Sequence, residues 1–348
     1  MIRARLTAQL LSGAQPSSPE QVLERLLAVQ AQDLRGARLA IRPRSTVTSV
    51  GDVDALLTDR RGAVITWLNR GTLHLVNAED YWWLHPLTTP QLRSGNRRRL
   101  MQEGLTPAAV DRGIEIVRDA VHRQGPRTRS ELKAALDGAG VRTEGQALVH
   151  LLFGASLRGL VVRGPIRNGE AAYVEVDGWL GPAPPPLGES EALARLARRF
   201  LAGHGPAGPG DLAKWAGVTL GRARLGLDAL AEAVVVDDDG HYDLVDRCPP
   251  AEVPEPTLLG AFDPVLHGWV DRAPLVGSHR GVVTSNGVFR ATALVGGRVV
   301  GTWGLSDGQV RLRLLEQISP SAAHSLAGDA RAVLAFLGLP EGRMEVTE

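Results

Sequence analysis

Two glutamines, Gln30 and Gln32, stand one residue apart at the end of a helix predicted over residues 18–30. A side-chain amide accepts hydrogen bonds through its carbonyl oxygen and donates them through its NH2 group, so two amides together can orient one small polar molecule. On a regular helix these side chains would point about 200° apart, whereas in an extended segment residues i and i+2 lie on the same side. The spacing leaves two interpretations open: a shared polar site on extended backbone, or one glutamine packed at a helix end and the other in solvent.

The helix that carries these amides has clear start signals. Ser18 is a capping residue, Pro19 suits the first helical position, and Gln21 completes a capping box with Ser18. Three leucines and Gln30 then share one face at i, i+3, i+4 and i+7 spacing. On a regular helix, Gln30 would therefore occupy a position where a core residue is expected.

Length and composition predict a soluble chain of several modules. With 348 residues, of which 44% are hydrophobic, two to four modules are expected. The sequence has no apolar run of membrane-spanning length and begins without the apolar stretch of a signal peptide, so we expect a cytoplasmic protein without a membrane partner. A single cysteine, Cys248, excludes an internal disulfide and fits a reducing compartment.

Positive charge is concentrated early in the chain. Residues 1–100 hold 14 basic and 8 acidic residues, residues 101–200 hold 13 and 12, and the remainder holds 12 and 18. Of the 39 cations 37 are arginine, whose planar fork suits phosphate oxygens. The plainer interpretation of the arginine excess is the codon bias of a GC-rich genome. The gradient itself resembles the footprint of a nucleic-acid contact surface.

A block of three helices followed by two strands occurs twice. The predicted helices and strands are 107–124, a second helix ending near 138, 145–159, 160–163 and 171–176 in the first copy, and 190–203, 210–216, 220–231, 234–236 and 242–245 in the second. This is the order of a winged helix. The proline-rich residues 181–188 predict a stiff linker between the copies.

The two ends of the chain differ: the N-terminal region repeats this pattern and the C-terminal region does not. The N-terminal region predicts a third copy, with helices at 4–11, 18–30 and 51–58 and strands at 63–68 and 71–76. After Pro254 the character changes, with strands near 281–284, 288–294, 298–304 and 309–314 and a closing helix over 321–337. We therefore expect an α+β fold with segments 1–105, 106–180, 189–250 and 255–348, the first three being winged-helix modules and the last β-rich.

Three stretches point to a family. Residues 30–33 read Gln-Ala-Gln-Asp, residues 66–76 read Thr-Trp-Leu-Asn-Arg-Gly-Thr-Leu-His-Leu-Val, and residues 262–266 with 301–303 read Phe-Asp-Pro-Val-Leu and Gly-Thr-Trp. Together they resemble the tandem winged-helix DNA glycosylases typified by the enzyme that unhooks azinomycin crosslinks, and the resemblance covers essentially the whole chain. It implies a C-shaped, DNA-binding concavity built from the three modules. It also implies a monofunctional enzyme that excises bulky N7- or N3-alkylated purines, often adducts of DNA-reactive natural products, with crosslink unhooking and self-resistance as further expectations.

The resemblance also implies the catalytic residues. One branch of the family carries a Gln-X-Gln motif, which Gln30 and Gln32 match, and a sister branch carries Gln-X-Asp. Asp33 follows directly, so it is the alternative base, and its other interpretation is a carboxylate at a helix end. An N7-alkylguanine already carries positive charge and leaves as a neutral base, so two amide carbonyls that direct one water toward C1′ suffice for such a substrate. A neutral amide is a weak base, which limits the reaction to cationic purines.

Further residues are candidates for contact with DNA: Thr66, Arg70, Thr72, His74, Arg97, Arg98 and Arg99. His74 has the alternative of a hydrogen-bonded structural histidine, and the three consecutive arginines that of a solvated face. The run Tyr81, Trp82 and Trp83 invites base stacking, but its spacing favours core packing.

Three function classes stay open at this point. They are a DNA glycosylase acting as a monomer on duplex DNA with alkylated purines, a winged-helix transcriptional regulator, and a DNA-damage-binding protein without activity. A regulator usually dimerises, and nothing in the sequence resembles a dimerisation coiled coil. No metal-ligand spacing and no glycine-rich phosphate loop are found, so we expect no metal and no other cofactor.

Overall fold

The computed structural model of the chain describes residues 1–347 and divides into two compact units. Unit 1 consists of Met1–Val53 and Leu193–Glu348, and unit 2 of Asp54–Ala192. Helix α4 (Val50–Thr58) and helix α11 (Glu189–His204) each contain a boundary between them. In the part of the chain that is described, every helix is too short or too polar to cross a membrane.

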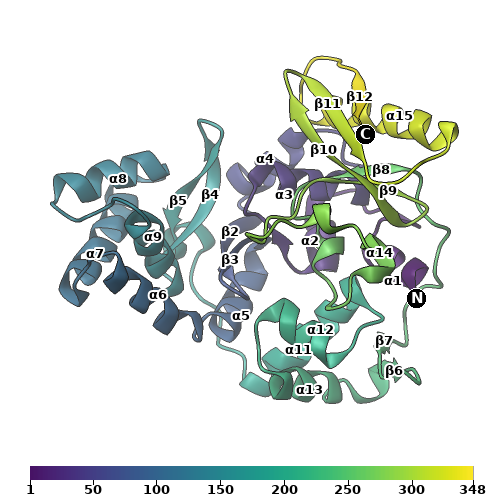
Figure 1. Ribbon diagram of the computed structural model, residues 1–348. Coiled ribbons are helices and arrows are strands. Elements are labelled where there is room, and N and C mark those ends of the chain that lie inside the picture. The colour runs from purple at the N-terminus through teal and green to yellow at the C-terminus, as the bar shows by residue number, and fades with distance from the viewer. Residues whose placement is uncertain (348) are drawn as a thin grey trace. The chain divides into compact units, whose positions relative to one another are not determined.

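Unit 2 joins two antiparallel hairpins in one sheet. Its elements are β2 (Ala63–Leu68), β3 (Thr72–Asn77), α5 (Ala78–Thr88), α6 (Leu92–Gln102), α7 (Pro107–Gln124), α8 (Arg129–Gly138), α9 (Ala147–Leu157), β4 (Val161–Arg167), β5 (Glu170–Glu175) and α10 (Val176–Leu180). Within the unit the strand order is β3-β2-β4-β5, and the hairpins meet where Ile65 pairs with Arg163. Helices α7, α8 and α9 pack together beside β4 and β5 (Figure 1). The hairpin predicted for the first module and the wing predicted for the second thus share a sheet.

Unit 1 combines helices from both ends of the chain with a second sheet. Its helices are α1 (Ile2–Ala8), α2 (Pro19–Leu26), α3 (Leu34–Ile41), η1 (Arg42–Arg44), α11, α12 (Pro209–Ala216), α13 (Leu220–Asp228), η2 (Ala231–Ala233), η3 (Pro264–Leu266), α14 (Ala273–Val276), η4 (Arg280–Val282) and α15 (Pro320–Phe336). Its strands are β1 (Val29–Gln30), β6 (Val234–Val236), β7 (Tyr242–Leu244), β8 (Thr257–Leu259), β9 (Thr292–Val295), β10 (Arg298–Ser306), β11 (Gln309–Leu314) and β12 (Met344–Thr347). The sheet order is β12-β11-β10-β9-β8, with β12 parallel to β11 and α15 against β8 and β12 (Figure 1).

Most predicted elements are confirmed to within a few residues. Both three-helix-and-hairpin blocks are present, because their helices begin at strong local caps such as the capping box between Thr128 and Glu131. The α+β class is confirmed, whereas the winged-helix description of the modules stays a prediction. The segment predicted as 1–105 is shared between the units, since Met1–Val53 belongs to unit 1 and the rest to unit 2.

Two predicted elements are wrong. The helix expected over 18–30 ends at Leu26, and the strand expected near 281–284 is the short helix η4 followed by one isolated bridge between Val283 and Phe289. In the first case the backbone reverses at Leu27, a turn with no glycine or proline to announce it. The elements that were not predicted are helices α3, α5, α6, α10 and α14 and strands β1, β8 and β12.

Candidate active site and nucleic-acid interface

A strained turn ends α2 just before the paired amides. Leu27 adopts φ 64° and ψ −49°, and the Ala28 N–H donates to the Leu26 carbonyl oxygen at 2.8 Å. A hydrogen bond from residue i+2 to residue i around a central residue of positive φ defines the strained form of the γ-turn, which is rare for a bulky side chain. Leu27 is fully buried, so packing holds it in this conformation. Outliers of this kind cluster at functional sites.

Beyond the turn the backbone is extended only briefly. Val29 and Gln30 form the two-residue strand β1, and Gln32 follows in a bend before α3 begins at Leu34. The amides therefore do not lie on a regular helix, but one is packed just beyond the helix end and the other is in solvent, as the second interpretation expects, so a shared site stays a prediction. Gln30 is 7% exposed and Gln32 is exposed. Within unit 1, as far as it is described, the Gln30 amide has no hydrogen-bond partner, so it is available to a bound molecule.

Asp33 is the capping residue of α3. Its carboxylate accepts a hydrogen bond from the backbone N–H of Arg35 at 2.9 Å. A cap of this kind stabilises a helix start by about 0.5 to 2 kcal/mol. The structure thus gives Asp33 the helix-end position that was one of its two interpretations, while its exposed side chain still adjoins Gln32 in the chain.

Helix α3 is held against the segment after β8 through two glycines. A Cβ atom at Gly36 would collide with the carbonyl oxygen of Ala261, and one at Gly260 would lie 2.9 Å from the carbonyl oxygen of Gly36. The two backbones therefore touch, which larger residues would prevent. This contact fixes the start of α3, and with it the C-terminal side of the amide pair.

Two ion pairs brace the end of α3. Arg44 donates to both carboxylate oxygens of Asp263, at 2.6 and 2.9 Å, and both side chains are fully buried. Arg42 forms a similar bidentate pair with Asp329, at 2.7 and 2.8 Å. The 262–266 stretch that helped to indicate the family thus positions α3. Sequence reasoning missed this role, because nothing in the local pattern pairs an arginine with a carboxylate 219 residues away.

The residues predicted to contact DNA on the β2–β3 hairpin lie in unit 2, whereas the amides lie in unit 1. Thr66 is fully buried and shares a hydrogen bond with the Ser156 hydroxyl at 3.0 Å, which favours a structural role. Arg70 is exposed in the turn between the strands. The Thr72 hydroxyl is buried, and in residues 1–347 it has no hydrogen-bond partner. DNA contact by these residues stays a prediction.

His74 is a buried, neutral histidine. Its Nδ1 lies 2.9 Å from the Thr72 carbonyl oxygen, which can only accept, so Nδ1 carries the proton. Burial, and to a smaller extent the charge of Arg70, lowers the pKa of His74 to about 3. Any contact of His74 with DNA would therefore involve a neutral ring rather than a cation.

Asn69, in the turn of the same hairpin, is a residue that sequence reasoning passed over. It is fully buried at φ 54°, and among the described residues neither atom of its amide has a hydrogen-bond partner. A buried amide left unpaired costs about 1 to 3 kcal/mol, so such a group calls for a water or a ligand. The sequence offered one reason to consider Asn69: it lies within the 66–76 stretch that resembles the family.

The predicted phosphate contacts lie on α6. Arg97, Arg98 and Arg99 are all exposed, and α6 contains no acidic residue. Arg99 forms an ion pair with Glu103 at 2.9 Å. Exposed guanidinium groups suit phosphate, so the interpretation as a DNA surface remains a prediction that the geometry permits.

The charge gradient along the sequence is absent when charges are counted for each folded unit. Unit 1 contains 22 basic and 22 acidic residues, and unit 2 contains 17 and 16. The N-terminal excess is divided between the units and is offset by acidic residues from the end of the chain. Local clusters such as α6, rather than net charge, therefore mark candidate nucleic-acid surfaces.

The aromatic run and one possible metal group have structural explanations. Tyr81 and Trp83 are buried in α5, as expected for core residues. Asp237, Asp239 and His241 bring ligand atoms within 4.8 Å of one another. The Asp237 carboxylate, however, accepts backbone hydrogen bonds from Asp239 and His241, at 3.0 and 2.8 Å, which close the β6–β7 turn. The expectation of no metal stays a prediction.

The chain belongs to the AlkZ-like DNA glycosylase family, whose profile, described as "DNA glycosylase AlkZ-like", matches residues 23–336. No curated protein matches the chain. Among solved structures, the fold is similar to that of the DNA glycosylase AlkZ of Streptomyces sahachiroi, with a TM-score of 0.79, 21% sequence identity, and coverage of 99% of this chain and 98% of the other. The protein is therefore a DNA glycosylase, an enzyme of DNA repair, and DNA is its substrate.

Proposed function

We propose that this glycosylase hydrolyses the bond between deoxyribose and bulky cationic purines of the N7-alkylguanine or N3-alkylpurine type, with Gln30 and Gln32 as its catalytic residues. The observation that carries the proposal is the break in the backbone at Leu27. After this break Gln30 and Gln32 lie on non-helical chain, and the proposal holds that their i and i+2 spacing lets both face one molecule. The unpartnered Gln30 amide supports the same assignment.

The chemistry follows from the substrate. A purine alkylated at N7 is already cationic and departs as a neutral base, so no strong acid is required. The enzyme must place a water behind the sugar while positive charge develops at C1′, and carbonyl dipoles of two amides both orient the water and stabilise that charge. Uracil and other uncharged bases need acid activation, so they should stay in the DNA.

Asp33 enters this proposal only as an alternative base. Because its carboxylate caps α3, Asp33→Asn should retain most of the activity if the amides act, since asparagine caps helices about as well. A loss as large as that of the glutamine variants would move the base role to Asp33.

Single-turnover base release from a duplex with one N7-alkylguanine tests the catalytic assignment. Gln30→Ala and Gln32→Ala should each slow release by about tenfold to a thousandfold, roughly 1.5 to 4 kcal/mol of transition-state stabilisation, and still bind DNA. Gln317→Ala removes an exposed amide elsewhere in unit 1 and should have no effect. Undiminished release by the double glutamine variant would eliminate the role. Binding without release of any alkylated base would instead favour a regulator or a damage sensor.

We also infer that the enzyme unhooks interstrand crosslinks made through purine nitrogens, because such a crosslink presents the same cationic leaving group. This activity would give resistance to a DNA-alkylating natural product. Separation of crosslinked from single strands on a denaturing gel, before and after incubation, measures it directly. We further infer that the enzyme is a cytoplasmic protein and acts as a monomer. Light scattering of the free and DNA-bound protein measures its oligomeric state.

A further inference from the structure

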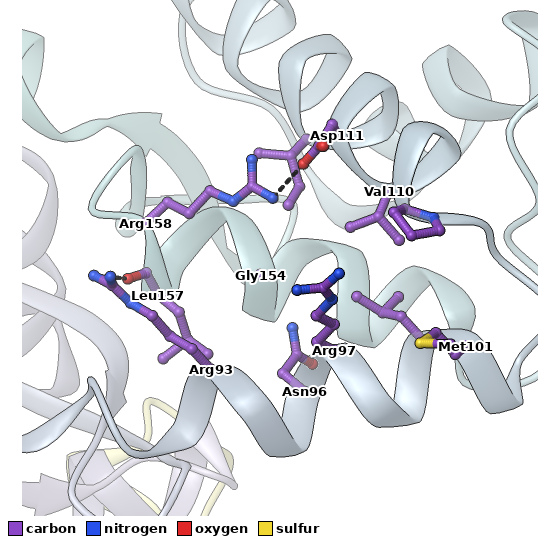
Figure 2. Close-up of a pocket in the computed structure, with 12 residues that line it drawn as sticks. Arg93, Asn96, Arg97, Met101, Val110, Asp111, Gly154, Leu157 and Arg158 are labelled. Atoms are coloured by element: carbon purple, nitrogen blue, oxygen red, sulfur yellow. Dashed lines mark hydrogen bonds and ion pairs between the residues drawn. The ribbon is translucent and has the colours of Figure 1, made fainter.

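An open pocket lies between α6, α7 and α9 in unit 2 (Figure 2). Its volume is about 340 Å³, near the lower end of the roughly 300 to 1,000 Å³ of small-molecule sites. Apolar side chains from all three helices line its floor, among them Leu100, Val110, Ile114 and Leu157. The pocket therefore has room for an apolar group of modest size.

Three arginines surround this floor, opposed by one carboxylate. Arg158 pairs with Asp111 at 2.5 Å, and Arg93 donates to the Leu157 carbonyl oxygen at 3.2 Å, as the dashed lines in Figure 2 show. Arg97 is exposed, and no partner for its guanidinium is found in residues 1–347. The rim thus has an excess of positive charge and one uncommitted guanidinium.

Gly154 lines the pocket where α9 packs closely on α6 and α7. A Cβ atom there would lie 3.1 Å from both the Asn96 amide nitrogen and the Ile114 Cδ1. Asn96 cannot easily move, because its amide donates to the His150 carbonyl oxygen at 3.1 Å and accepts from His150 Nδ1 at 2.7 Å. Since those polar atoms are occupied, the floor offers contact to an apolar face, and the rim offers charge.

We propose that this pocket binds one unstacked nucleotide of DNA, with its base on the apolar floor under Arg97 and its phosphate at the arginine rim. The inference rests on the assignment of the protein as a DNA-acting enzyme and names a docking point that no part of the catalytic proposal uses. Enzymes that act on a base take nucleotides out of the stack, and unstacked bases are held by apolar contacts and by guanidinium groups. DNA is favoured as the occupant because α6 contributes Arg93 and Arg97 to the rim and has two further exposed arginines beside the pocket, with no acidic residue of its own.

Fluorescence anisotropy of the full chain with two undamaged duplexes tests the proposal, one fully paired and one with a single unpaired nucleotide. Arg97→Gln and Arg98→Gln form a matched pair, because both residues are exposed on α6 but only Arg97 lines the pocket. Both changes should weaken binding to the paired duplex to a similar extent. Only Arg97→Gln should remove the preference for the unpaired nucleotide, which we expect to be about tenfold from the combined stacking and charge contacts.

Two further arms identify what occupies the floor. An abasic unpaired site should bind like the paired duplex, and Val110→Trp, which fills the pocket, should remove the preference while the circular dichroism spectrum stays unchanged. Displacement of the duplex by free dGMP at stoichiometric amounts would overturn the proposal in favour of a free nucleotide. Equal effects of Arg97→Gln and Arg98→Gln on both duplexes would also overturn it, leaving α6 as a diffuse phosphate surface.

These outcomes are independent of catalysis. Gln30→Ala should retain the preference for the unpaired nucleotide even where it releases no base. If base release fails for every alkylated substrate but the preference persists, the catalytic proposal falls and the pocket assignment stands. If release proceeds normally and the preference is absent, the pocket assignment alone is wrong.

Discussion

The two units have almost the same charge balance, yet the arginines at the end of α3 in unit 1 and those of α6 in unit 2 have opposite environments. In unit 1 the arginines at the end of α3 are buried or nearly so and are committed to carboxylates, as in the pairs of Arg44 with Asp263 and Arg42 with Asp329. In unit 2 the arginines of α6 are exposed, and Arg97 and Arg98 have no partner among the described residues. Arginine side chains in this protein therefore have two roles: some form buried ion pairs that stabilise the fold, and others are exposed and suited to binding a polyanion.

This difference follows from solvation. A buried guanidinium has lost its water and depends on its partner, so its energetic role is felt mainly when the pair is broken. An exposed guanidinium keeps its water and gains little from any one neighbour, but it can exchange that water and a counterion for phosphate. Substitutions that remove the same charge should accordingly have different consequences in the two units.

The largest contrast is expected between Arg44→Met and Arg98→Gln. Arg44→Met leaves the Asp263 carboxylate buried without its partner, which should lower the free energy of unfolding by about 3 to 5 kcal/mol. Arg98→Gln should change it by less than about 0.5 kcal/mol. Urea unfolding followed by tryptophan fluorescence measures both. A loss below about 1 kcal/mol for Arg44→Met would mean that the pair does not brace α3.

Acid should affect both units through buried histidines. Burial lowers the pKa of His204 in unit 1 to about 3 and that of His85 in unit 2 to about 4. The unfolded value is about 6.5, so the unfolded chain binds more protons at intermediate pH. The contribution of each neutral ring to stability is complete above pH 6.5 and is lost as the pH falls toward the folded pKa.

Between pH 7 and pH 5 each of these histidines should reduce the free energy of unfolding by about 2 kcal/mol. His85→Gln, which can still donate to the Ser156 carbonyl oxygen, and His204→Leu should each shrink the difference between the two pH values by that amount. Urea unfolding at both pH values provides the measurement. An unchanged difference in either variant would show that the ring is not buried and neutral as described.

Local signals explain how much of the fold could be predicted. Thr106 and Thr128 cap the starts of helices α7 and α8, and the prediction gave the bounds of α7 and the end of α8. Helix α6 was missed because its sequence, dominated by arginine and polar residues, has no apolar periodicity; only Asn96 and Leu100 are buried. The γ-turn at Leu27 is imposed by packing, and the local sequence contains no glycine or proline that would predict a turn.

The candidate site could be predicted only in part for the same reason. The amides and their i, i+2 spacing are visible in the sequence, and so was the condition that the helix must end before they can act together. The contact of Gly36 with Ala261 and the pairing of Arg44 with Asp263 join residues more than 200 positions apart. A single sequence contains no signal for such pairings, and the charge gradient was misleading because the units are not contiguous in the chain.

A smaller effect separates strain from packing at Leu27. Leu27→Ala and Leu27→Gly both delete the buried side chain, but only glycine adopts positive φ without strain. At an ordinary position Gly is the less stable of the two; here Leu27→Gly should be more stable than Leu27→Ala by about 1 kcal/mol in urea unfolding. Glycine also makes the turn more flexible. If the turn holds the amides in place, base release by Leu27→Gly should therefore be slower than base release by Leu27→Ala, although Leu27→Gly is the more stable variant. Alanine as the more stable variant would exclude strain at this residue.

The smallest expected effect distinguishes arginines within α6. Each phosphate interaction that a substitution removes should reduce the slope of log affinity against log salt by about 0.9. Arg98→Gln should produce that change on a paired duplex, whereas Arg99→Gln should produce less, because Glu103 already neutralises Arg99 at 2.9 Å. Glu103→Gln should then steepen the slope by releasing Arg99 for phosphate. Identical slopes for all three variants and the unaltered protein would place the phosphate contacts outside α6 and leave its exposed arginines without a part in DNA binding.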